Sequence, residues 1–277
     1  MIKKLVASLI CIGMFFQCLE AGLLDGLLAR KKHQNIAPSV PVLLVHDCPG
    51  VVLEVKGKYR LYDPNHHCYL STRYIGKRKF IQALKEGLRW GEEFPGVHQL
   101  LIVPDNDTVT TIVDGIEYQG GIYVYDVEGC ISVVNEIDIE DYLQVVLANQ
   151  ECEGLPQEVL AAIAIAARTT AYHYAHSPKS PYWGIQAEAV GYRGYALTKP
   201  NSSLAQSIVA TRYMIMTTPD NEGRLNPFEA NFLAKGNGKN SRITLQEAVE
   251  MAQKGSHAAQ ILQKAFPGSA IILTHEP

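Results

Sequence analysis

Carboxyl and amide side chains gather near the middle of the chain, at the break between two helical patterns. A carboxylic acid there could act as a general acid or base, and the free N–H groups at a helix start attract polar ligands. Acidic side chains near a helix N-terminus also stabilise the helix dipole, and the residues alone favour this structural role. The group consists of Gln150, Glu151, Glu153 and, after a turn, Glu158.

Two predicted helices must position this group. In the first, over residues 139–149, Ile139 and Leu143 begin an apolar stripe with helical spacing. Pro156 then opens the second helix, where its missing N–H costs nothing, and the pattern continues to about His176. Alanines on several faces of the second helix predict that it is buried on more than one side.

The chain divides into a β-rich part followed by a helix-rich part, which predicts an α+β fold in which the two parts pack together. Short apolar runs broken by Asp, Pro, Gly and Asn predict strands, whereas residues 81–88 are predicted to form a short helix. Residues 177–200 and 217–241 are predicted to be loops. Strands are expected at 42–45, 51–55, 59–62, 100–103, 108–113, 116–118, 122–125 and 131–134, and further helices at 203–210, 244–254 and 258–265.

Residues 1–21 have the order of a secretory signal, with a basic head, a 12-residue apolar run and a closing alanine. The apolar run is too short for a stable membrane span. We therefore expect export, either with cleavage after Ala21 or with an N-terminal anchor, for which lipid attachment at Cys18 is one route. Residues 22–40 are predicted to form a linker.

The composition excludes several classes of protein. Twenty-five Lys and Arg stand against 28 Asp and Glu in 277 residues, a net charge of −3, which is too neutral for nucleic-acid binding by phosphate neutralisation. A hydrophobic content of 47% excludes a disordered chain. No run beyond the N-terminal segment reaches the roughly 18 apolar residues of a membrane span.

Four cysteines lie beyond the N-terminal segment: Cys48, Cys68, Cys130 and Cys152. An oxidising compartment would favour disulfides, and four cysteines allow three pairings, which the spacing does not choose between. Cys48 and Cys68 each follow closely after histidine, so a zinc site is conceivable, but their spacing matches no familiar set of ligands. Disulfides or buried thiols are favoured.

Four segments of the chain together resemble the SpoIID/LytB domain family, and they occur in the same order as in the family. One alanine-rich helix is easily matched by chance, but four segments in order over roughly residues 100–270 are specific. The matches are Asp114–Gly120, Asn135–Leu143 with the pattern Asn-Glu-x-x-x-Glu-Asp-Tyr-Leu, the helix Leu160–Thr169, and a closing segment made of Ala248–Gly255 and Ile261–Gly268.

The resemblance implies work on the cell wall, outside the cytoplasmic membrane. Enzymes of this family cleave peptidoglycan glycan strands as lytic transglycosylases, preferring strands stripped of stem peptides, and other members enhance cell-wall amidases. A carboxylic acid protonates the glycosidic oxygen, and its conjugate base then helps the 6-hydroxyl of the muramic acid close on C1. The expected partners are therefore glycan strands and amidase or division proteins.

The position of the family's acid falls on an amide in this chain. Counting back six residues from Pro156 without a gap gives Gln150, whose amide cannot usefully exchange a proton. A one-residue bulge, with slack supplied by Gly154, would bring Glu151 into the site instead. An active transglycosylase using Glu151 and a binding or amidase-enhancing module without catalysis both stay open. A purely structural envelope protein is less favoured.

Several other residues are candidates for binding the glycan. Tyr182, Trp183 and Tyr192 fall in a predicted loop, where exposed aromatic faces can pack on the C–H faces of sugars. Arg168 is either a ligand for acidic muramic substituents or a buried partner of Glu140 or Glu151, and its apolar helix favours the second role.

The family's glycine-rich and metal-binding motifs are only partly matched. Lys239 stands where the family has a histidine, and residues 226–235 contain no histidine for the family's metal loop. We therefore expect neither a metal nor a cofactor.

The predicted organisation is a signal peptide, a linker, one SpoIID/LytB-like domain and a short tail. Their bounds are 1–21, 22–40, 41–270, divided into a β-rich part 41–134 and a catalytic-like helical part 135–270, and 271–277. We expect the protein in the periplasm or the cell envelope.

Overall fold

In the N-terminal half, strands bury apolar side chains at every second position. In β2 (Val51–Lys56), Val51, Leu53 and Val55 are buried and the side chains between them are not. The computed structural model describes residues 38–76, 78–148, 152, 154–178, 180–195, 198, 201–232 and 241–274. All of them belong to the compact unit Pro38–Pro277.

The first sheet has seven strands in the order β13–β1–β12–β11–β8–β3–β4. Neighbouring strands are antiparallel, except that β13 and β1 run parallel. The bounds are β1 (Ser39–Cys48), β3 (Tyr59–Asp63), β4 (Cys68–Arg73), β8 (Gln99–Pro104), β11 (Gly121–Val127), β12 (Cys130–Asp138) and β13 (Ile185–Gln186).

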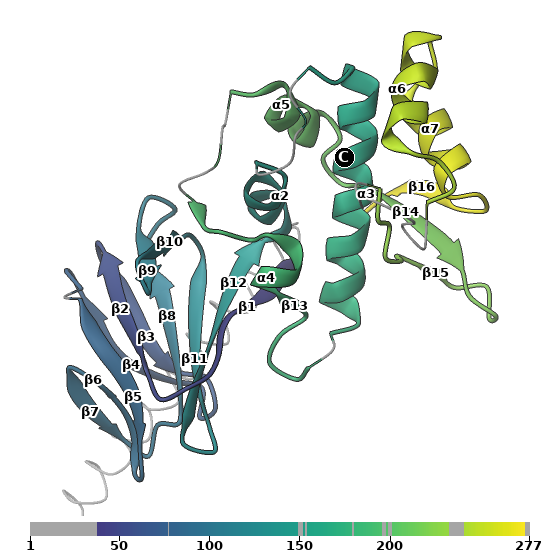
Figure 1. Ribbon diagram of the computed structural model, residues 1–277. Helices are drawn as coiled ribbons and strands as arrows, with labels where there is room; N and C mark the ends of the chain where they lie inside the picture. Colours follow the sequence, from purple (N-terminus) through teal and green to yellow (C-terminus); the bar gives the residue numbers. More distant parts are fainter. Residues whose placement is uncertain are drawn as a thin grey trace, which may run out of the picture. The chain divides into compact units, whose positions relative to one another are not determined.

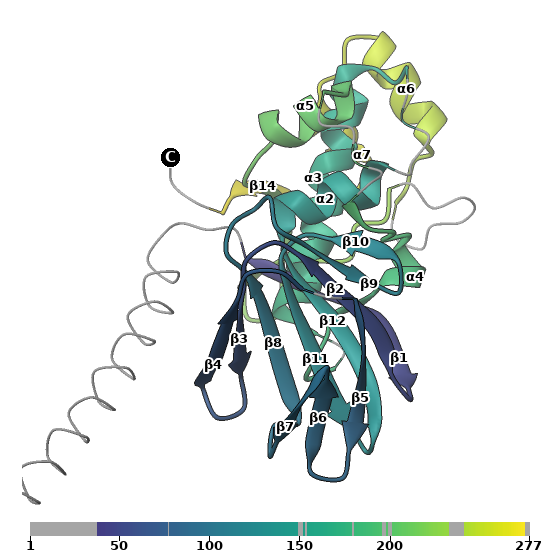
Figure 2. The ribbon, with the colours of Figure 1, turned by 90° about the vertical axis from the view of Figure 1, so that its left-hand side faces the viewer.

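The second sheet has six strands in the order β10–β9–β2–β5–β6–β7. It shares one core with the first sheet, which takes Leu53 and Ile81 from the second sheet and Leu61, Leu100 and Ile122 from the first. Figures 1 and 2 show the strands of both sheets gathered in one part of this unit. The remaining bounds are β5 (Lys79–Leu84), β6 (Gly87–Trp90), β7 (Glu92–Pro95), β9 (Thr110–Val113) and β10 (Ile116–Tyr118).

The helix predicted over residues 81–88 is wrong, because this segment forms the β5–β6 hairpin. Ala83 pairs with Leu88 across a tight turn, and Gly87 has a φ of 131° that favours glycine. The apolar run was too short for its periodicity to distinguish a helix from two strands. The strands predicted elsewhere in the N-terminal half are confirmed.

Two helices follow the first sheet. β12 leads directly into α2 (Ile139–Ala148), and α3 (Gln157–His176) begins after Pro156, which is its N-cap rather than its first residue. Twelve of the 20 residues of α3 are buried, and α3 contacts helices as well as strands β1 and β14, so its predicted burial on several sides is confirmed.

The segment after α3 contains more regular structure than predicted. Helices α5 (Ser203–Ala210), α6 (Leu245–Gln253) and α7 (Ala258–Ala265) agree with the predicted helices, but α4 (Ala187–Val190) and β13 lie in a predicted loop. A third sheet has the order β15–β14–β16. Its strands, β14 (Met214–Pro219), β15 (Leu225–Asn226) and β16 (Ala270–Leu273), fall largely in segments predicted as loop or tail.

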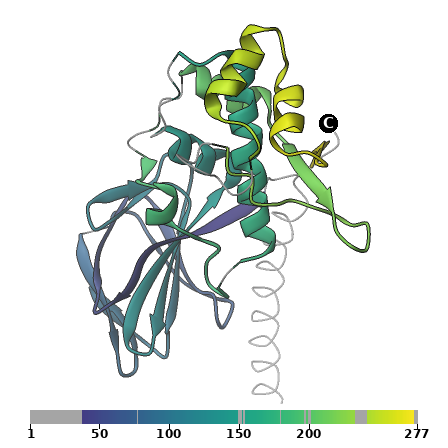
Figure 3. The same ribbon diagram turned by 45° about the vertical axis from the view of Figure 1, so that its right-hand side comes forward.

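Helix α3 is the element around which the helical part is assembled. It contacts α2, α5, α6 and α7 as well as β14, and Figure 3 shows the C-terminal helices packed along it. Helices are concentrated after Asp138, and strands predominate before it, so the α+β fold class is confirmed.

Candidate functional site

The corner between α2 and α3 is where the sequence predicts the catalytic acid. Gln150 and Glu151 lie outside the described residues, as does Lys239. The structure describes both flanks of the corner: α2 ends at Ala148, and Cys152, beyond it, is buried. The position of the corner is therefore set by the two helices that enter and leave it.

Arg168, on α3, is fully buried and is occupied by protein groups. Its Nε and Nη2 atoms donate to the two carboxylate oxygens of Glu140 at 2.7 and 2.8 Å. Nη1 donates to the Thr211 hydroxyl and the Met214 carbonyl, and Nη2 also donates to the Ile208 carbonyl. All five N–H groups of the guanidinium are thus used, so Arg168 is the buried partner of Glu140 and has no donor left for a glycan substituent.

This ion pair joins the two helices of the corner. Bidentate Arg–carboxylate pairs are strong and directional, and this one links α2 to α3 while the other donors hold the end of α5 and the start of β14. Next to it, the Thr169 hydroxyl accepts a hydrogen bond from the backbone N–H of Met216 at 2.8 Å. Buried hydrogen bonds therefore hold the two helices that flank the corner in place.

Glu158 caps a helix distant from it in sequence. It lies in the first turn of α3, and its Oε2 accepts a hydrogen bond from the backbone N–H of Ala258 at 2.7 Å. Its Oε1 lies 3.6 Å from Nδ1 of His257, the N-cap of α7. The carboxylate thus stabilises the N-terminus of α7, which is a structural role.

Tyr192 is buried in the fold, which contradicts its predicted exposure to a glycan. Its hydroxyl donates to Oδ1 of the buried Asn135 at 2.5 Å. Its ring stacks between Tyr118 and Tyr142, with centroids 5.7 and 5.8 Å away. The hydrogen bond to Asn135 supplies the partner that a buried phenol needs. Together the three contacts hold the segment after α4 against β12, β10 and α2.

Tyr182 and Trp183 remain partly accessible, but they lie away from the corner. The Tyr182 ring is 4.7 Å from that of Tyr125 on β11, and the Trp183 ring meets His46 edge-on at 5.1 Å. Tyr182 is 37% exposed and Trp183 is half-buried. Both follow the C-terminal end of α3, whereas the corner precedes its N-terminus, about 30 Å away along 20 residues.

The start of α2 carries crowded carboxylates, which the sequence alone did not indicate as a site. The pKa of Asp141 is raised to about 6 by loss of hydration and by the charges of Asp138, Asp107 and Glu140, which outweigh Arg212. Asp141 is exposed, so loss of hydration is limited, and the crowding of like charges is the stronger reason why its pKa is raised. Such a pKa suits a general acid near neutral pH.

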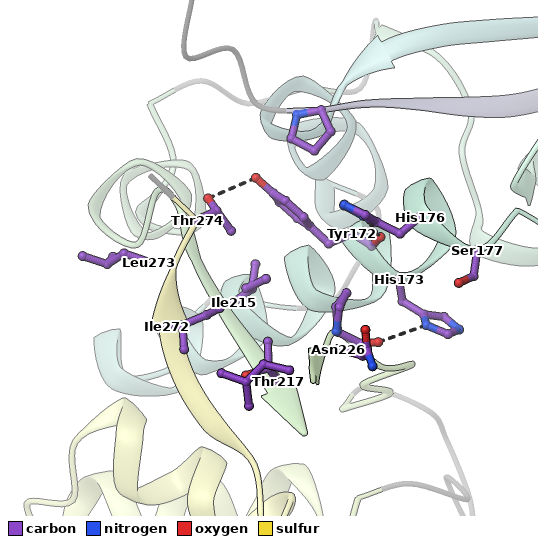
Figure 4. A pocket seen from close by; sticks show the side chains of 13 residues that line it. Tyr172, His173, His176, Ser177, Ile215, Thr217, Asn226, Ile272, Leu273 and Thr274 are labelled. Atoms are coloured by element: carbon purple, nitrogen blue, oxygen red, sulfur yellow. Dashed lines mark hydrogen bonds between the residues drawn. The ribbon is translucent and has the colours of Figure 1, made fainter. Parts of the chain in front are cut away.

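A pocket of about 650 Å³ opens where the C-terminal end of α3 faces β14 and β16 (Figure 4). Its lining includes His173 and His176 of α3 and Thr217 of β14. In its wall, the Tyr172 hydroxyl donates to the Thr274 hydroxyl at 3.1 Å. The sequence did not indicate this pocket, because the strands that enclose it fall largely in segments predicted to be a loop and a tail.

No group of three or more His, Cys, Asp or Glu side chains in the described part of the chain is arranged to hold a metal ion. Cys48 on β1 and Cys68 on β4 are five strand spacings apart in the first sheet, about 24 Å, so a joint zinc site is excluded. Cys48, Cys68, Cys130 and Cys152 are free thiols. None of the helices described is long and apolar enough to cross a membrane.

The scaffold of the corner coincides with a known domain family. The family model SpoIID, described as stage II sporulation protein, matches residues 127–218, from the end of β11 to β14. An uncharacterized protein of Chlamydia pneumoniae is 33% identical over 264 residues, which cover 93% of this chain and 90% of the relative. The chain belongs to the SpoIID family.

Other relatives of this SpoIID protein extend the comparison. An uncharacterized protein of Chlamydia muridarum is 29% identical over 276 residues, covering 98% of this chain and 91% of the relative. An uncharacterized protein of Brachyspira hyodysenteriae is 30% identical over 165 residues, covering 59% of this chain and 44% of the relative. Membership of the SpoIID family indicates a role related to the cell wall.

The SpoIID match covers some parts of the candidate site and leaves others out. It includes Glu140, Arg168 and the corner between α2 and α3. It does not include the six-stranded sheet, and it ends before β15 and β16, which enclose the pocket of Figure 4. The pocket is therefore partly built from structure outside the family match.

Proposed function

We propose that this protein is exported and cleaves peptidoglycan glycan strands as a lytic transglycosylase, with Glu151 as its acid. The observation that carries the proposal is the SpoIID match, because it spans the corner where Glu151 stands in the sequence. The buried Arg168–Glu140 pair supports it, since a catalytic group needs a rigid support and this pair fixes both flanking helices.

In the proposed reaction one carboxylic acid serves twice. Glu151 donates its proton to the glycosidic oxygen as the bond from that oxygen to C1 breaks. The 6-hydroxyl of the same muramic acid then attacks C1, and the Glu151 carboxylate takes up the hydroxyl proton, which leaves a 1,6-anhydro end. No water enters, so the reaction needs no second carboxylate to activate one.

The second candidate function is a glycan-binding or amidase-enhancing module without catalysis. An ungapped count places Gln150, not Glu151, at the position of the family's acid. The partly exposed rings of Tyr182 and Trp183 favour binding, because they offer apolar faces away from the corner.

Release of 1,6-anhydro ends from denuded glycan strands, measured by mass spectrometry, distinguishes the two functions. We expect the purified protein to release such ends and Glu151→Gln to lower the rate by about 100-fold or more, because a general acid contributes at least that much. Glu153→Gln, two residues away, is the matched control and should keep the rate of the unmodified protein.

Two outcomes would contradict catalysis by Glu151. Binding of strands without release by the unmodified protein would support the binding module instead. Release by Gln150→Glu but not by the unmodified protein would show that catalysis was lost at residue 150 itself.

A further inference from the structure

The pocket of Figure 4 is separate from the α2–α3 corner. Its lining residues on α3, from Tyr172 to His176, begin about 22 Å along the helix from Gln157. Its other walls come mainly from the third sheet and the turn after β15. A volume of about 650 Å³ falls within the range of small-ligand pockets, roughly 300–1,000 Å³.

Two imidazole rings offer hydrogen-bond acceptors in this pocket. His173 Nδ1 lies 3.1 Å from the carbonyl oxygen of Pro227, and His176 Nδ1 lies 2.8 Å from that of Tyr172. Because a carbonyl oxygen only accepts, each Nδ1 carries a proton, and in the neutral ring each Nε2 is an acceptor. Neither Nε2 has a partner among the described residues.

Another polar group of the lining is available, the exposed side chain of Asn226. Asn226 donates through Nδ2 to Asp220 at 3.0 Å, which leaves its Oδ1 free to accept. The Thr217 hydroxyl also has no hydrogen-bond partner in the described part of the chain, but its oxygen atom has no accessible surface and is therefore closed to a ligand.

The pocket has no fixed charge with which to hold an ion. None of the described residues that line it is Asp, Glu, Lys or Arg, and burying an ionic ligand without a counter-charge is costly. Acceptors predominate among its free polar atoms, and Ile215, Leu225 and Ile272 add apolar surface. This combination fits a neutral molecule with several hydroxyl donors and an apolar C–H face.

We propose that this pocket binds a neutral saccharide of one or two rings. Sugar hydroxyls donate to Nε2 of His173 and His176 and to Oδ1 of Asn226. The inference goes beyond the proposed function, because it needs neither Glu151 nor cleavage of a strand.

Calorimetric titration of the full chain with N-acetylglucosamine and its β-1,4-linked disaccharide tests this pocket. We expect saturable binding that His176→Asn and Asn226→Ala each weaken by about tenfold, since each removes a hydrogen bond to the sugar. His67→Asn is the matched control: His67 is an exposed histidine outside the pocket, and Asn tolerates its φ of 51°. It should leave the affinity unchanged.

The proposal is overturned if neither sugar binds saturably, or if both pocket variants, with melting temperatures no lower than that of the unmodified protein, bind as tightly as it does. Tighter binding of cationic glucosamine or of glucose 6-phosphate would also overturn it, because the pocket would then select a charge. Glu151→Gln should keep the sugar affinity, so failure of strand cleavage and failure of this pocket give different results.

Discussion

Arg168 and Thr217 are both buried polar side chains, and they differ in whether their polar atoms have partners. Each N–H of Arg168 meets an acceptor, whereas the Thr217 hydroxyl has no partner within the described residues. A satisfied arginine stabilises the fold and has no donor left for a ligand, while a buried hydroxyl without a partner destabilises the fold. The hydrogen-bond partners, rather than burial, separate the two roles.

Thr217→Val should raise the free energy of unfolding by about 1 kcal/mol, because it removes an unpartnered buried hydroxyl and keeps the side chain's shape. Urea denaturation measures the change. Thr211→Val is the matched control: its hydroxyl donates to the Ser207 carbonyl and accepts from Arg168, so the same exchange should destabilise by about 1–3 kcal/mol. Equal changes in the free energy of unfolding in the two variants would show that the Thr217 hydroxyl does have a hydrogen-bond partner.

Asp141 predicts a fall in stability with rising pH. Its folded-state pKa of about 6 lies above the ordinary value of 3.8, so the folded protein keeps a proton that the unfolded chain loses between about pH 4 and pH 6. Stability therefore falls as pH rises through this window. Asp141→Asn should show a smaller fall, because only the raised pKa of Asp138 remains, and should be more stable than the unmodified protein at pH 7.5 but not at pH 4.

Urea denaturation midpoints at these two pH values measure the effect. Glu86→Gln, a substitution at an exposed position in the β5–β6 turn, should leave the pH profile as it is. An undiminished fall in Asp141→Asn would show that other groups cause it.

At the scale of the elements, the Arg168–Glu140 pair determines how α2 meets α3. Arg168 is fully buried and the Glu140 side chain is 12% exposed, so solvent screens the pair little. The two helices flank the corner where Glu151 is expected to act. Loosening this pair should therefore affect both stability and the proposed cleavage.

Glu140→Gln should lower the free energy of unfolding by about 3–5 kcal/mol, because it leaves a buried guanidinium without its counter-charge. Chemical denaturation gives the value, and hydrogen exchange of α2 amides should increase. The double variant Glu140→Gln with Arg168→Met should lose less than the sum of the single variants, since the orphaned charge is absent. Arg224→Gln, at an exposed ion pair, should cost less than about 1 kcal/mol. Additive losses would contradict the coupling.

Elements that carry their own signals were predictable from the sequence. Helices α5 and α7 have the predicted bounds, because each has a periodic apolar face and a clear start, such as the Ser202 side chain that caps α5. The β5–β6 hairpin and the third sheet were missed. Strands of two to six residues carry little periodicity, and β14 finds its partner β16 more than fifty residues later.

At the scale of the whole molecule, the fold class could be predicted from the β-rich and helix-rich parts of the sequence, and the family from the four ordered motifs. The candidate site could be predicted only in part. The pairing of Arg168 with Glu140 was one of two roles that the sequence allowed. The burial of Tyr192 was not foreseen, because its partners Tyr118, Tyr142 and Asn135 come from three other elements. Contacts of this kind depend on tertiary packing, which local periodicity does not encode.

The chain contains two tryptophans, and their surroundings provide two separate fluorescence signals. Trp90 is buried in the second sheet beside Tyr59, whereas Trp183 is half-buried beside His46. A glycan that covers Tyr182 and Trp183 would shift the emission of Trp183, while a sugar in the pocket of Figure 4, which has no tryptophan in its lining, would leave the spectrum in place. The emission spectrum of the unlabelled protein can thus distinguish its two candidate carbohydrate surfaces.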